Sequence, residues 1–146
     1  MWAGQDEGPA LVVVDPSGAA KHQELPPTWS ELAQHFQVAW CRVPASEHSL
    51  DEVEDVLETL AERQSLAHIV ASGEACPAAI TIAEQFADMI GAVLLVDPVT
   101  EVGTLTGIDV HVVARSHPGP TDRVEAPMPL GHPEVVDGIV SALAGS

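Results

Sequence analysis

Aromatic residues are scarce in this chain. It has no tyrosine, and its three tryptophans and two phenylalanines make up 3% of the sequence. The apolar fraction is nevertheless 46%, so we expect a core packed mainly from valine, leucine, isoleucine and alanine. Such a composition is typical of a buried parallel sheet, whose strands are apolar on both faces.

Basic residues are equally few. Five lysines and arginines stand against 22 acidic residues, which gives a formal net charge of -17. This charge repels nucleic acids and anionic membranes, and it makes a polyanionic ligand unfavourable. It is compatible with a well-solvated surface or with a basic partner, and the sequence alone does not separate these two interpretations.

The two cysteines, Cys41 and Cys76, are too few for a disulfide framework. No apolar stretch approaches the roughly 20 residues that cross a bilayer. The first twenty residues also lack a cationic segment followed by an apolar run. We therefore expect a soluble, cytoplasmic protein with reduced thiols.

Apolar runs alternate with helical patterns along the chain, which has a length suited to one domain. We expect a flexible segment over residues 1–9 and one domain over residues 10–146. The expected strands are 10–14, 37–43, 66–71, 92–96 and 110–114, with a possible sixth at 124–128, and the expected helices are 28–36, 50–61, 77–90 and 133–143.

Strands that alternate with helices predict an α/β fold, a three-layer sandwich with a mostly parallel sheet of five to six strands and helices on both faces. Right-handed crossovers and a central, uniformly apolar first strand give the spatial order 2-1-3-4-5. Sites in such sheets lie at the carboxyl ends of the strands, beside the point where the order reverses. The loop at Asp15 and the turn at Gly73 are neighbours there.

The turn at Gly73 joins the third strand to the helix after it. Ala71 and Ala75 stand two residues before and after Gly73, and small residues are needed where a strand and a helix meet at a sharp turn. This is the spacing of the nucleophile elbow, G-x-S-x-G, although the central residue here is glycine.

From Ala10 onward, the chain resembles a shortened α/β-hydrolase fold protein. The matching segments are 11–18 (strand and oxyanion loop), 28–36 (the next helix), 70–75 (the elbow), 94–98 (the strand after it) and 130–135, the Gly-His segment. The resemblance implies that His132 matches the catalytic histidine of the family and that Asp122 is the residue most like its acid.

The chain departs from the family at functional positions. Gly73 replaces the nucleophile, Asp15 replaces the histidine of the oxyanion loop, and residues 100–109 are too few to form a lid. Ser72 is the alternative nucleophile, so the candidate catalytic set is Ser72, Asp122 and His132. Cys76 stands beyond the elbow, beside the start of the next helix, where packing as a small apolar residue is the simpler interpretation.

Neither a metal nor a cofactor is predicted. The other histidines are scattered without the short spacing of metal ligands. The loop after the first strand has one glycine and an acid, which does not suit a phosphate. A flavodoxin-like mononucleotide binder has the same strand order and is the alternative fold, without support from this loop.

Two functions remain open at this stage. The first is a catalytically degenerate hydrolase-like domain that binds a protein partner or a small apolar ligand at the strand carboxyl ends. The second is an active hydrolase of a small ester or acyl compound that uses Ser72, Asp122 and His132. The expected binding rim comprises residues 15–18, 72–75, 97–100 and 117–132. The oligomeric state is open.

Overall fold

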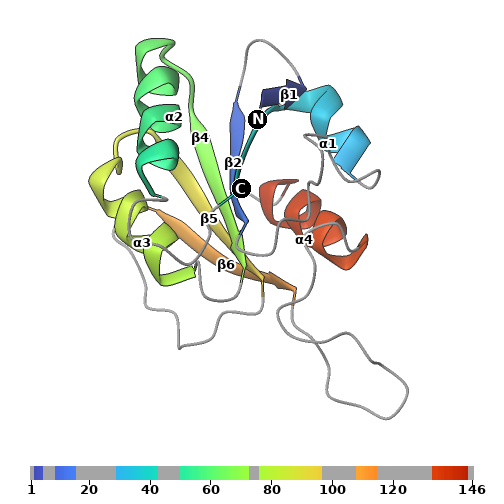
Figure 1. Cartoon of the computed structure of the whole chain (residues 1–146). Coiled ribbons are helices and arrows are strands. Elements are labelled where there is room, and N and C mark those ends of the chain that lie inside the picture. The colour runs from blue at the N-terminus through green and yellow to red at the C-terminus, as the bar shows by residue number, and fades with distance from the viewer. Residues whose placement is uncertain are drawn as a thin grey trace.

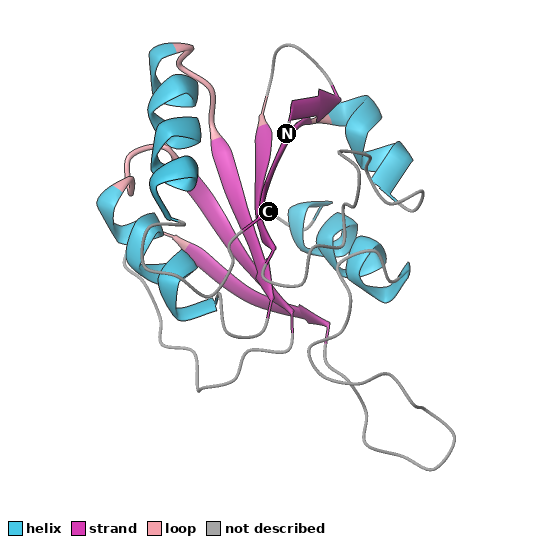
Figure 2. Ribbon diagram, viewed as in Figure 1, coloured by secondary structure: helices cyan, strands magenta, loops and turns pink. Residues whose placement is uncertain are grey.

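The computed structural model describes residues 2–4, 9–15, 29–42, 50–72, 76–96, 108–114 and 133–144. These residues form a six-stranded sheet in the order β1-β3-β2-β4-β5-β6 with helices on both faces (Figures 1 and 2). The strands are β1 (Trp2–Gly4), β2 (Ala10–Asp15), β3 (Gln37–Arg42), β4 (Ala67–Ser72), β5 (Ile90–Val96) and β6 (Asp109–Ala114). The helices are α1 (Ser30–His35), α2 (Leu50–Glu62), α3 (Cys76–Gln85) and α4 (Pro133–Ala144).

Strands β2 to β6 are parallel, and their order confirms the predicted 2-1-3-4-5 arrangement. The central strand β2 pairs with β3 on one side and with β4 on the other. Its residues 10 to 14 are all fully buried, as expected for a strand that is covered on both faces. The predicted fold class is therefore correct.

The N-terminal strand β1 is an addition to this prediction. The sequence predicts a flexible segment over residues 1–9, yet Trp2 to Gly4 pair antiparallel with β3, from Trp2 opposite Ala39 to Gly4 opposite Gln37. Pairing satisfies backbone groups at the β3 edge of the sheet. A three-residue strand carries too little hydrophobic pattern to be recognised from sequence. The possible sixth strand at 124–128 lies outside the described residues.

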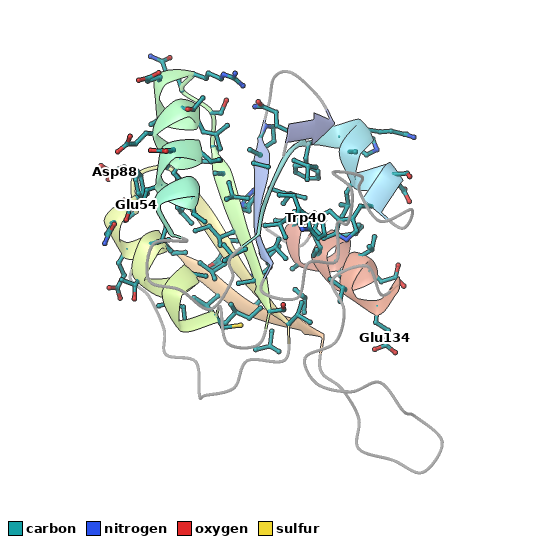
Figure 3. All side chains as sticks on the ribbon, viewed as in Figure 1. Trp40, Glu54, Asp88 and Glu134 are labelled. Carbon is teal, nitrogen blue, oxygen red and sulfur yellow. The ribbon has the colours of Figure 1, made fainter. Side chains whose placement is uncertain are left out.

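Helices α2 and α3 cover one face of the sheet (Figure 2). The buried face of α2 consists of Val53, Val56, Leu57 and Leu60, which confirms the helical period read from the sequence. Asp55 and Glu58 are exposed on the other face, and Figure 3 shows Glu54 directed away from the sheet. The buried residues of α3 are small or aliphatic: Cys76, Ala79, Ile82 and Ala83.

Helices α1 and α4 cover the opposite face (Figure 2). Trp29 and Trp40 are both buried there, with ring centroids 4.9 Å apart in an edge-to-face arrangement. Figure 3 shows Trp40 in the layer beneath α1 and α4. The composition suggested a mainly aliphatic core, but the core on this face also contains two buried tryptophans. Trp29 also holds the N-cap position of α1 without a side-chain cap bond.

Helix α3 is shorter than predicted. It ends at Gln85 rather than at about Ile90, and both Ile90 and Gly91 belong to β5. In the pairing with β4, Ala67 and His68 face Ile90 and Ala92, so Gly91 is the extra residue of a bulge. A Cβ at Gly91 would lie 2.8 Å from His68 Cε1, so glycine makes room for the imidazole.

A polar cluster ties β3 to the end of α2. Gln37 is 1% exposed. Its Nε2 donates to Ser65 Oγ at 3.3 Å, and Arg63 Nη1 donates to its Oε1 at 3.2 Å. These bonds satisfy a buried amide at the amino ends of the strands, away from the carboxyl ends where the candidate site lies.

Candidate functional site

The order of the sheet reverses between β2 and β4, because the chain passes from β2 to β3 on one side and then to β4 on the other. Val14 of β2 is paired with Ala71 of β4. The next residues, Asp15 and Ser72, are the last of their strands. Their backbones thus come side by side at the position where open α/β sheets bind ligands.

Ser72 is the only member of the candidate triad among the described residues, since Asp122 and His132 both lie outside them. It ends β4 and is 1% exposed. Strand residues alternate between faces, and Val70 belongs to the core beneath α1 and α4. Ser72 therefore lies on the α1/α4 face, at the end of a regular strand, and is enclosed by protein.

The turn between β4 and α3 is short. Strand β4 ends at Ser72 and α3 begins at Cys76, so residues 73–75 alone make the connection. These three residues, which include Gly73, lie outside the described residues. Ala71 is fully buried in the core beneath α2 and α3, together with Ala79 and Ala83 of α3. These small side chains let the strand and the helix approach closely.

Cys76, the first residue of α3, is 1% exposed. Its Sγ lies 3.9 Å from the carbonyl oxygen of Val96, the last residue of β5, so the thiol donates a weak hydrogen bond to the end of that strand. The side chain links the start of α3 to β5 and packs as a small apolar residue, in agreement with the interpretation from sequence.

His68 is the titratable side chain that sequence reasoning did not single out. Its Nδ1 is buried and has no hydrogen-bond partner among the described residues. Burial lowers the pKa of this imidazole below its usual value. The sequence signal that could have found it is a histidine inside an apolar run. The contact of its ring with Gly91 is visible only in the structure. His68 lies four residues before Ser72, about 13 Å along the strand, so the two do not share a site.

Metal ligands do not gather in the described part of the chain, where no group of three or more histidine, cysteine, aspartate or glutamate residues could hold an ion. Among the described residues, no helix is both long and apolar enough to span a membrane.

No protein-family model matches the chain, and no curated protein matches its sequence.

Proposed function

We propose that this chain is a catalytically degenerate α/β-hydrolase-like domain that binds a protein partner or a small apolar ligand at the carboxyl ends of β2, β4 and β5. The burial of Ser72 is the observation that carries the proposal. The strand order supports the location, because the reversal between β2 and β4 lies beside Ser72.

Burial argues against covalent catalysis by Ser72. A nucleophilic oxygen must reach a substrate carbonyl and stand beside donors for the developing oxyanion. Ser72 is 1% exposed and belongs to a regular strand rather than to the tip of a turn. Cys76 is equally buried, and its thiol is directed to the Val96 carbonyl. Neither side chain is placed to attack a ligand from solvent.

Charge supports the kind of partner. At a net charge of -17, the domain attracts a basic, apolar-tipped partner and repels an anionic one. The rest of the expected rim, including Asp97, Val99 and Met128, lies outside the described residues. The cysteine content remains in favour of a cytoplasmic setting.

Labelling with a fluorophosphonate, followed by intact-mass measurement, tests the loss of catalysis. We expect no stoichiometric adduct on the wild-type protein. An adduct that disappears in Ser72→Ala and persists in Ser141→Ala would instead support the active hydrolase that uses Ser72, Asp122 and His132. Ser141 is a suitable control because it is an exposed serine on α4.

Native mass spectrometry and pull-down tests address the binding role. The combined change Asp97→Ala, Val99→Ser and Met128→Ser should abolish the interaction detected with the wild-type protein. The control carries Asp55→Lys and Glu58→Lys on the exposed face of α2. Loss of binding in the α2 variant, with binding retained in the rim variant, would place the interaction on the acidic helix and contradict the proposal.

A further inference from the structure

The two edges of the sheet are treated differently. At one edge, β1 lies against β3. At the other edge stands β6, which pairs with β5 and with no other strand among the described residues (Figure 1). An edge strand presents a row of backbone N–H and C=O groups that another strand can join.

Strand β6 has few of the devices that usually block such pairing. It contains no lysine and no proline, and Asp109 is its single acidic residue in a chain that has 22. The register irregularity with β5 comes only after Val112, so residues 109 to 112 run regularly. Val112 is a large apolar side chain that is 39% exposed. The first four residues of β6 are thus suited to receive another strand.

We propose that β6 pairs antiparallel with β6 of a second copy of this chain, about a two-fold axis at Val110, to form one continuous sheet. In this register, Asp109 of each copy lies opposite His111 of the other, and Ile108 lies opposite Val112. Directly opposed residues have Cβ atoms about 4.5–5.5 Å apart. The pairing therefore sets a carboxylate beside an imidazole twice and places Val112 next to the border of the partner's core at Ile108, which is itself buried.

The charge of the whole chain acts against this dimer. Two copies that each carry a net charge of -17 repel one another. Salt screens this repulsion, because the Debye length falls from about 10 Å at 0.1 M to about 3 Å at 1 M. The dimer should consequently become more stable as salt rises, whereas capture of a basic partner should weaken.

Sedimentation of the full chain over a range of protein and salt concentrations tests the proposal. We expect a species of twice the monomer mass whose fraction increases with both. Val112→Lys should remove it, since a charged side chain would replace the apolar contact with Ile108 of the second copy on the same face of the sheet, while Val140→Lys should retain it. Val140 is a matched control because it is 45% exposed on α4. A wild-type monomer under all conditions, or an equal response of the two variants, would overturn the proposal.

Cysteine cross-linking tests the register independently of any lysine variant that fails to fold. Val110→Cys places two thiols across the two-fold axis, so mild oxidation should yield a covalent dimer above the wild-type background. Val112→Cys should not cross-link to itself, because its neighbour in the second copy is Ile108. Efficient cross-linking at position 112 and none at position 110 would contradict the proposed pairing.

Discussion

The two faces of the sheet are covered by different types of side chain. The fully buried side chains beneath α2 and α3 are aliphatic apart from one cysteine, with Phe86 partly buried against them, whereas the face beneath α1 and α4 fully buries two tryptophans. By strand alternation with Val70, the second face holds His68 and Ser72 as well. The aliphatic face is stabilised by the burial of apolar side chains, whereas the other face also holds a buried serine and a partly buried histidine.

The largest expected effect comes from removing one tryptophan of the buried pair. Trp40→Ala should lower the free energy of unfolding by about 3–5 kcal/mol, because it leaves a large cavity. It also removes an edge-to-face contact that contributes about 0.5–1.5 kcal/mol. Urea unfolding measures the loss, with Leu57→Ala as the control on the aliphatic face. A smaller loss for Trp40→Ala than for Leu57→Ala would show that the pair adds little to its face.

The next largest change in the free energy of unfolding is expected where α4 contacts β6. A Cβ at Gly138 would overlap the carbonyl oxygen of Val113 and lie 2.8 Å from Val113 Cβ. Overpacking costs about 1–3 kcal/mol, and the better helix propensity of alanine offsets about 1 kcal/mol. Gly138→Ala should therefore destabilise the protein by up to about 2 kcal/mol in urea unfolding. Ser141→Ala, at an exposed position of the same helix, should change stability little. Equal effects would mean that α4 moves freely over β6.

His68 should make the stability of the face beneath α1 and α4 depend on pH. Its folded-state pKa is lowered by burial, whereas an unfolded histidine titrates near about 6.5. Below that pH, the unfolded state binds a proton that the folded state resists, so stability should fall as the pH drops from about 6.5 toward the folded pKa. The contribution is complete above about 6.5. Urea unfolding of the wild type and of His68→Gln at several pH values isolates this imidazole. Parallel curves for the two proteins would refute the expectation.

The sequence was sufficient for the features that depend on local pattern. The helical period of α2 and the apolar run of β2 predicted their buried residues, and right-handed crossovers then determined the strand order. Contacts between separate elements were harder to predict from the sequence. Trp29 and Trp40 meet only once α1 and β3 are packed. The sequence left Gly91 between a helix expected over 77–90 and a strand expected over 92–96, and its role became visible only with the His68 ring beside it. The candidate triad is of the same kind, because Asp122 and His132 are linked to Ser72 by resemblance alone.

The smallest expected change in the free energy of unfolding is at the turn after α2, at the border of the aliphatic face. Gln64 has φ 57°, in the left-handed region. Its N–H donates to Ala61 O at 3.0 Å, and the N–H of Ser65 donates to Leu60 O at 3.0 Å. This is a Schellman motif, and its left-handed position favours glycine. Glycine removes a strain of about 1–2 kcal/mol but costs about 0.5–1 kcal/mol in chain entropy. Gln64→Gly should therefore raise the free energy of unfolding by about 0.5–1 kcal/mol.

The matched control is Gln64→Ala, which keeps a Cβ at the same left-handed position and should bring no gain. Urea unfolding of the two variants separates relief of backbone strain from loss of the glutamine side chain, because both variants lose that side chain equally. A gain for alanine as large as that for glycine would show that the side chain, not φ, limits the stability of this turn. A gain for glycine alone would mean that the face beneath α2 can be improved at its boundary without any change to its aliphatic packing.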